Sequence, residues 1–392
     1  MQFDKAVNLE DLHQIAKRKI PKIVFDFIEG GVEDEHGMAR NEEAFRSVGL
    51  LPRYLVDVTK RDQSTVLFGR AYSSPFGIAP TGIAGIFRRG ADLMLAEAAR
   101  DANVPFIMSG ASTASIEDLG KVAPEHGWYQ LYMAKDKAIS HDQVRRAADA
   151  GLSTLVLTVD VPIRPRRERN IRNGFSRPLQ LSLATKLDAL RYPEWLLDYL
   201  RHGTPLFSNW TAYAPKGADA DAVADFFESQ TPAHLTWADV ETLRKLWPRN
   251  FVLKGIMRTD DAERAAALGV NGIMVSNHGG RQLDRAASPV EVLPAMAEAV
   301  GDRMTVMLDG GVRRGSDAIT ALCLGAKFVF MGRPTLYGAV AGRTDGVRHA
   351  LSIVRREVDL TLGQIGAPTL ADLGPDLLMW DRPEDRRRNR RP

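Results

Sequence analysis

Short apolar runs alternate with longer stretches of mixed polarity from about residue 75 onward. Each run is four to six residues long and is bounded by polar or turn-forming residues, which is typical of buried strands. We predict strands at Phe76–Ala79, Pro105–Ser109, Trp128–Met133, Thr154–Val159, Phe251–Lys254, Gly272–Ser276, Thr305–Asp309 and Phe328–Gly332. Between them, apolar residues recur at helical spacing, for instance at Ala91–Asp101, Asp142–Ala150, Arg258–Leu268, Val290–Ala299 and Ser316–Leu324.

This alternation extends over about 250 residues and predicts an α/β fold of the (β/α)8 class, a TIM barrel. The alternative is a doubly wound open sheet. No Gly-x-Gly-x-x-Gly sequence opens the first crossover, which argues against the nicotinamide-binding form of that alternative. A barrel would place its chemistry at the C-terminal ends of the strands.

Helical patterns also flank the predicted barrel. Leu9–Arg18 is amphipathic, Pro21 suits the first turn of a following helix, and Gly346–Leu362 is expected to be a closing helix. We therefore expect one barrel domain over residues 1–380, followed by a basic, disordered tail over residues 381–392.

A long insertion separates the fourth and fifth predicted strands. Residues 176–235 hold no predicted barrel strand and include the aromatic-rich, amphipathic run PEWLLDYLRHGTPLFSNW. Connections of this length in compact domains are usually functional or mobile. We interpret it as a lid over the barrel mouth, an oligomer contact or a segment that lies in the plane of a membrane surface.

Composition narrows the class of protein only slightly. The chain has 392 residues, of which 44% are hydrophobic and 26% charged, an ordinary globular balance. The net charge of +3 is too small to suggest nucleic-acid binding. Cys323 is the only cysteine, lies in an apolar helical run, and is expected to be a buried packing residue. The N-terminus does not resemble a signal peptide, and no apolar run reaches about 18 residues, so we expect a cytoplasmic protein.

The most informative stretch is SNHGGRQLD, residues 276–284, which follows a predicted strand. His278 can accept a proton near neutral pH, and Arg281 can hold a carboxylate with two parallel hydrogen bonds. The two glycines permit a close approach of the backbone to a ligand. The stretch predicts a site that binds an acid anion and removes a proton from it, whereas the plain alternative is a surface loop.

Two glycine-rich runs follow the last two predicted strands. LDGGVRRGSD (308–317) and FMGRP (330–334) lie where barrels often bind a phosphate through backbone N–H groups. Gly310, Gly311 and Gly332 permit that approach, while Arg313 and Arg333 supply positive charge. Lys254 ends another strand, and a buried lysine needs a partner, either a carboxylate or an anionic cofactor.

These motifs together resemble the FMN-dependent 2-hydroxy-acid dehydrogenases and oxidases. SNHGGRQLD resembles the active-site signature of that family, the two glycine-rich runs resemble its FMN-phosphate segments, and PKIVFDFIEGGVEDE resembles its N-terminal segment. The similarity extends from about residue 10 to about residue 365. It implies FMN as the cofactor, oxidation of a 2-hydroxy acid to a 2-oxo acid, and a homotetramer.

The resemblance also implies roles for the matching residues. Arg281 and Arg167 would hold the substrate carboxylate, Tyr132 would hydrogen-bond the hydroxyl oxygen, and His278, backed by Asp160, would accept the proton. Lys254 would contact the N1–O2 edge of the flavin. The other implied FMN-binding residues are Thr81, Gly82, Ser109, Gln130, Thr158, Ser276, Asp309, Gly310, Gly311, Arg313, Gly332 and Arg333.

Three positions bear on which member of the family this is. Phe27 stands where the family has a tyrosine that contributes to the carboxylate site, so that hydrogen bond is lost or replaced. Ala111 replaces the bulky aromatic residue of the glycolate oxidases and leaves room for a lactate-sized or aromatic side chain such as that of mandelate. Gly82 is more usual in the dehydrogenases, whereas the oxidases more often carry alanine.

We therefore expect an (S)-2-hydroxy-acid dehydrogenase that passes electrons to a quinone or another carrier. The alternatives are an oxidase that uses O2, an IMP-dehydrogenase-like barrel, which would need a cysteine in an active-site loop, and a flavin-binding scaffold that lacks turnover. The residues allow hydride transfer from C2 or prior removal of the C2 proton. The insertion resembles that of membrane-associated members of the family, which favours peripheral membrane contact.

Overall fold

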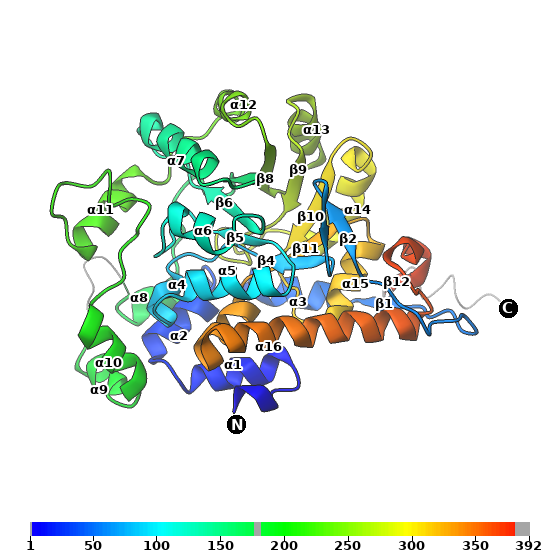
Figure 1. Cartoon of the computed structure of the whole chain (residues 1–392), viewed down its shortest axis with the longest axis horizontal. Helices are drawn as coiled ribbons and strands as arrows, with labels where there is room; N and C mark the ends of the chain where they lie inside the picture. The colour runs from blue at the N-terminus through cyan, green and yellow to red at the C-terminus, as the bar shows by residue number, and fades with distance from the viewer. Residues whose placement is uncertain (1, 176–181, 381–392) are drawn as a thin grey trace.

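The computed structural model describes residues 2–175 and 182–380 and contains a closed barrel of eight parallel strands (Figure 1). In ring order the strands are β4 (Phe76–Ile78), β5 (Phe106–Met108), β6 (Gly127–Leu131), β7 (Thr154–Thr158), β8 (Asn250–Ile256), β9 (Gly272–Val275), β10 (Thr305–Asp309) and β11 (Phe328–Met331). Each strand overlaps one of the predicted runs. The TIM-barrel prediction is confirmed, and the open-sheet alternative is wrong.

The barrel strands are mostly apolar and are buried on both faces. Ile107 of β5 points into the barrel, where it packs with Trp128, Val156 and Val252, while its neighbours Phe106 and Met108 belong to the outer core. This alternation fits the side-chain period of two, and parallel strands covered on both faces are expected to be apolar throughout.

Helices cover the outside of the barrel and account for the periodic stretches between the strands (Figure 1). They are α5 (Ala91–Asp101), α6 (Ile116–Val122), α7 (Lys137–Asp149), α12 (Trp237–Leu246), α13 (Thr259–Ala267), α14 (Pro289–Val300), α15 (Gly315–Cys323) and α16 (Arg333–Ile365). Cys323 is buried in α15, as predicted. The closing helix is longer than predicted and is kinked at Gly342 and Arg343, which have non-helical backbone angles.

Different elements lie at the two ends of the barrel. The hairpin of β2 (Thr65–Leu67) and β3 (Arg70–Tyr72) packs Leu67 and Tyr72 against the inner core. At the opposite end lie α2 (Lys22–Glu29), α3 (His36–Arg46) and the short α4 (Ala84–Phe87), while α1 (Leu9–Lys17) packs on α16. Pro21 directly precedes α2 as its N-cap residue and does not lie within the first turn.

Small elements complete the chain. The strand β1 (Val48–Leu50) pairs antiparallel with β12 (Leu378–Trp380). The described residues include three 3-10 turns, η1 (Phe3–Lys5), η2 (Leu370–Asp372) and η3 (Pro375–Leu377). The basic tail, residues 381–392, lies outside the described residues, and its predicted disorder stays a prediction.

The insertion between β7 and β8 forms helices that project to one side of the barrel (Figure 1). They are α9 (Leu183–Ala189), α10 (Pro193–His202) and α11 (Ala220–Gln230); the short α8 (Glu168–Arg172) precedes the insertion and packs against α2, and residues 176–181 lie outside the described part. Two polar contacts hold α10 on the barrel: Arg88 donates to Glu194 at 2.6 Å, and the Trp195 indole donates to the Ile86 carbonyl at 2.8 Å. None of the described helices is long and apolar enough to cross a membrane.

Candidate active site

A cavity of about 1200 Å³ opens at the C-terminal ends of the barrel strands and continues beneath the insertion. Single small-molecule sites are usually about 300–1,000 Å³, so this cavity has room for a cofactor and a substrate together. Most of the predicted site residues line it, namely Phe27, Thr81, Gly82, Ala111, Tyr132, Thr158, Arg167, Lys254, His278, Arg281, Asp309, Gly310, Gly311, Arg313, Gly332 and Arg333. Ser109, Asp160 and Ser276 lie behind this lining and contact Ala111, His278 and Lys254, while Gln130 accepts from the Ser109 hydroxyl and the Gly110 N–H.

His278 and Asp160 form a hydrogen-bonded pair at the cavity wall. Asp160 lies two residues beyond β7, His278 three residues beyond β9, and the His278 Nδ1 is 2.9 Å from the Asp160 Oδ1. A carboxylate accepts from Nδ1–H, so this bond assigns the tautomer in which Nε2 carries a lone pair. Nε2 lies 3.4 Å from the Tyr132 hydroxyl, within the cavity. The pair can therefore accept a proton from a ligand that lies beside both His278 and Tyr132 in the cavity.

The loop that carries His278 has an unusual backbone. His278, Gly279 and Gly280 have φ values of 57°, 64° and 74°, all in the left-handed region. A side chain at Gly280 would lie 2.6 Å from the Met38 backbone nitrogen, so glycine is required for the loop to pack on α3. Strained conformations of this kind persist where the surrounding structure holds them, and they cluster at functional sites.

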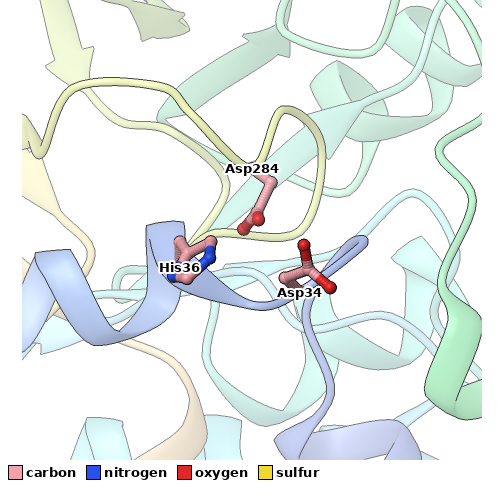
Figure 2. Close-up of side chains that lie close together, drawn as sticks. All are labelled: Asp34, His36 and Asp284. Carbon is pink, nitrogen blue, oxygen red and sulfur yellow. The ribbon is translucent and has the colours of Figure 1, made fainter.

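Contacts to α3 hold this loop, and sequence reasoning missed them. The amide groups of Asn277 and Asn41 exchange two hydrogen bonds of 2.7 and 2.8 Å. Asp284 accepts from the Gly37 backbone N–H at 2.9 Å, and Figure 2 shows its side chain directed toward Asp34 and the start of α3. Asn277 and Asp284 belong to the SNHGGRQLD motif, which was the available signal, whereas their partners lie over 200 positions away in the chain.

Burial and neighbouring charges set the protonation of the pair. Burial lowers the pKa of His278 below its ordinary value of about 6.5, although Asp160 acts in the opposite direction. Burial would raise the pKa of Asp160, but its interaction with His278, which includes the hydrogen bond, and the positive charge of Lys254 outweigh burial and hold that pKa below its usual value. Near pH 7 the pair is therefore a neutral imidazole beside a carboxylate, the state needed to accept a proton.

The pH dependence of turnover should reflect this lowered pKa. A base must be neutral to act, so kcat/KM is expected to stay level above about pH 6.5 and to fall only as the pH drops through the lowered pKa of His278. The pH profile of flavin reduction under anaerobic conditions measures this. An acid limb with its midpoint above about 6.5 would contradict the assignment.

Three arginines gather at one side of the cavity. Arg281 donates to the Phe27 carbonyl at 3.0 Å and to the Gly30 carbonyl at the end of α2, and Arg333 donates to the Ile28 carbonyl at 2.9 Å. Burial and the charges of Arg167 and Arg333 lower the pKa of Arg281 well below its usual value. Three buried guanidinium groups in mutual repulsion favour binding of an anion, because an anion offsets that repulsion.

Phe27 contributes its ring to this group. The Arg281 guanidinium lies 5.2 Å from the centroid of the Phe27 ring, and Phe175 packs against the same ring at 4.7 Å between centroids. The position that carries a tyrosine in the related family therefore supplies a cation–π contact to Arg281. It offers no hydroxyl group to a carboxylate.

Lys254 has a carboxylate partner, one of the two alternatives left open by the sequence. Its Nζ lies 3.2 Å from the Asp309 Oδ2 and donates to the Ser276 Oγ at 2.9 Å. Burial lowers the pKa of Lys254, but Asp309 and Asp160 raise it to a net value above normal. Since an ammonium has three donors, one remains for a ligand at the barrel axis.

Several buried polar atoms nearby have no hydrogen-bond partner among the residues that the structure describes. They are the Thr81 Oγ1, Gln130 Nε2, Thr158 Oγ1 and Asp309 Oδ1. Buried polar groups are normally satisfied, so such a group of atoms indicates a polar ligand. Gly310 and Gly311, with φ of 96° and 87°, and Arg313 line the adjoining part of the cavity. These residues fit FMN. The polar atoms without partners could bond the edge of its ring, while Arg313 and the backbone N–H groups at Gly310 and Gly311 could bind its phosphate.

The fold and this site define a barrel enzyme for a phosphate-bearing cofactor and an anionic substrate. The family model for FMN-dependent dehydrogenase matches residues 16–380. The chain is 40% identical over 371 residues to the (S)-mandelate dehydrogenase of Pseudomonas putida, covering 95% of this chain and 93% of the relative. It is 36% identical over 381 residues to the 2-hydroxyacid oxidase of Dictyostelium discoideum, covering 97% and 92%.

A solved structure gives the same result. The crystal structure of the monotopic membrane protein (S)-mandelate dehydrogenase superposes with a TM-score of 0.92 at 39% identity, covering 96% of this chain and 100% of that chain. The chain belongs to the FMN-dependent α-hydroxy-acid dehydrogenase family. It is an enzyme of FMN-dependent 2-hydroxy-acid oxidation, and the family resemblance expected from the sequence is confirmed.

Proposed function

We propose that this enzyme oxidises an (S)-2-hydroxy acid with a lactate-sized or aromatic side chain and passes the electrons to a quinone. The observation that supports it most directly is the His278–Asp160 pair facing the same cavity as Arg281 and Arg167. Arg281 and Arg167 bind the carboxylate, Tyr132 orients the hydroxyl group, and the His278 Nε2 accepts a proton. FMN, when bound, supplies the acceptor for the two electrons that leave the substrate.

Other residues act on the cofactor in this proposal. Lys254 directs its free donor at the flavin edge, where negative charge develops on reduction. Thr81, Gln130 and Thr158 bond the ring through atoms that otherwise lack partners among the described residues. The phosphate would be bound by Arg313, Arg333 and the backbone at Gly310, Gly311 and Gly332. Ser109 hydrogen-bonds Gln130 and Ser276 hydrogen-bonds Lys254, so both support the ring contacts. His278 serves as the base in either route: it accepts the hydroxyl proton if hydride leaves C2, or the C2 proton if that proton is removed first.

An apolar wall beside Ala111 supports the choice of substrate. Ala111 belongs to a cluster with Phe207, Trp210 and the partly buried Phe227, and the Phe207 and Phe227 rings stack at 4.9 Å between centroids. Phe207, Phe227 and Ala111 all line the cavity. An apolar or aromatic substituent on C2 would bury surface here, whereas glycolate has none to bury.

The surface of the insertion supports a membrane-dissolved acceptor. Leu183, Leu187, Leu190, Leu197 and Leu200 on or beside α9 and α10 are each more than half exposed. Lys186 and Arg191 lie between them in the sequence and Arg201 directly follows Leu200, and apolar side chains beside basic ones are typical of helices that lie in a membrane surface. This favours a dehydrogenase at the membrane surface; an oxidase that uses O2 is the second candidate, because relatives include an oxidase.

Acidic substitutions on this surface should weaken membrane binding. The double substitution Leu197→Glu and Leu200→Glu is expected to reduce cosedimentation with anionic vesicles by about tenfold or more, because it removes apolar surface and adds repulsion. Flavin reduction by substrate should stay unchanged. Leu246→Glu with Leu360→Glu, at positions 47% and 50% exposed on α12 and α16, is the matched control. Equal binding by both double variants would contradict the proposal.

Anaerobic reduction tests the reaction itself. The purified protein, reconstituted with FMN, is mixed separately with glycolate, lactate and mandelate, and the visible bands of the flavin are followed. Bleaching by (S)-mandelate or lactate supports the proposal, and slow return of the colour in air distinguishes a dehydrogenase from an oxidase. The proposal would be contradicted if the protein failed to bind FMN, or if the flavin stayed oxidised with every acid.

Light scattering of the same sample tests the predicted homotetramer.

A further inference from the structure

The hydrogen bond between Asp160 and His278 has to cross an intervening strand. Asp160 follows β7 and His278 follows β9, and β8 lies between these two strands in the barrel. Neighbouring strands lie about 4.8 Å apart, so the pair spans roughly 10 Å of backbone separation above the end of β8. Whatever residue ends β8 at this level therefore lies under the bond, and its side chain would compete with the carboxylate for space.

The end of β8 carries an irregularity at that level. Lys254 pairs with Met274 of β9, and Ile256 pairs with the next residue, Val275, so Gly255 is an extra residue on β8. An insertion of this kind is a β-bulge, which bends the strand and is common beside active sites. Gly255 has φ of +104°, a conformation that side chains rarely adopt. The Lys254 carbonyl just before it accepts from the Val159 N–H at 2.9 Å, which ties the chain leading to Asp160 to the bulge.

The space above Gly255 is filled by Asp160. A Cβ added at Gly255 would lie 2.5 Å from the Asp160 Cβ and 2.6 Å from its Cγ, with the Asp160 nitrogen at 3.0 Å. The Asp160 Cβ, Cγ and backbone nitrogen are fixed by the main chain, so they cannot move aside as the end of a long, flexible side chain could. The Asp160 side chain is also only 12% exposed, which leaves it little free space to move into.

We propose that Gly255 is a positioning residue for the reaction. Because it has no side chain, the bulge leaves the space in which Asp160 lies with its carboxylate against the His278 Nδ1. The inference rests on the proposed function. Any side chain at position 255 displaces Asp160, and His278 then loses the bond that sets its tautomer and orientation. Displacements of about 1 Å in such groups cost about 10²-fold in rate.

The test is Gly255→Ala with Gly269→Ala as its matched control. Gly269 also has a left-handed backbone, with φ of +71°, but no described atom lies within 4 Å of an added Cβ, so it shares the strain without the contact. Gly255→Ala is expected to slow flavin reduction about 10²-fold with KM within about threefold of wild type. Gly269→Ala is expected to match wild type. Equal rates for the two variants would overturn the proposal.

A second measurement separates positioning from general damage. NMR titration of the protein labelled with [15N]histidine, with the His278 signal assigned by its loss in His278→Gln, should show the pKa of His278 lower in Gly255→Ala than in wild type, because Asp160 raises it. Asp160→Asn combined with Gly255→Ala should be no slower than Asp160→Asn alone. An unchanged His278 titration, or fully additive rate losses, would overturn the proposal.

If Gly255→Ala does not fold, the pair Gly255→Ala with Asp160→Gly removes the collision and should fold as Asp160→Gly does; failure of that double variant would overturn the proposal, since the strain would then lie in the backbone alone. If wild-type flavin is reduced by none of the acids, the proposed function fails, whereas the His278 titration still decides the role of Gly255.

Discussion

Replacing His278 with glutamine is expected to slow anaerobic flavin reduction by about 10²–10⁴-fold, the usual contribution of a positioned general base. Glutamine can occupy the space and donate toward Asp160, but it cannot accept the substrate proton. The His278 side chain contacts Asp160 and Tyr132, so substrate binding by the arginines should persist. FMN content and the Kd for the 2-oxo acid product should therefore stay near wild-type values.

A second histidine of the same cavity provides the control. His234 also lines the cavity, in the segment between α11 and α12, and His234→Gln should leave the rate of flavin reduction unchanged. Stopped-flow absorbance of the flavin band measures both variants. Comparable losses in the two would mean that the effect comes from the shape or polarity of the cavity, and the role of His278 as base would be wrong.

The barrel could be predicted from the sequence because its signal is local. Each strand is a short apolar run that repeats with a helix between, and the residues at the strand ends, such as Lys254 and Asp309, are polar where the neighbouring positions are apolar. Once the ring closes, those ends meet at one mouth. The hairpin β2–β3 and the pair β1–β12 were not predicted, because these short strands are partly exposed and form no continuous buried run, unlike the equally short β4 and β5.

The contacts that hold the site could not be predicted, because they join distant segments. Nothing in the neighbourhood of Asn41 indicates that its amide bonds Asn277 across 236 positions. The extra residue at Gly255 is visible only once β8 is paired with β9. The partner of Lys254 could not be chosen from the sequence either, because a carboxylate and an anionic cofactor were both possible. The structure places Asp309 beside it, and one donor remains for a ligand.

Arg281→Met is expected to weaken binding of the acid by about 30-fold or more, which corresponds to the 2 kcal/mol or more typical of truncating one partner of a buried charged pair. Arg281→Lys should lose less, because it keeps the charge but not the planar fork that matches a carboxylate. Titration of the flavin band with the 2-oxo acid product measures both. Arg164→Met, at the rim of the same cavity, is the control and should bind the product as wild type does.

Arg281 also supports the end of α2, so a loss of binding alone would not prove contact with the substrate. It donates to the carbonyl groups of Phe27 and Gly30, and methionine removes those bonds as well. A substrate amide, which lacks the carboxylate charge, resolves the two effects. If Arg281 binds the carboxylate together with Arg167, wild type should prefer the acid over the amide and Arg281→Met should show a smaller preference, because one of the two cationic partners is gone. A preference that is unchanged by the substitution would mean that Arg281 only stabilises α2 and that the carboxylate is bound by Arg167 without it.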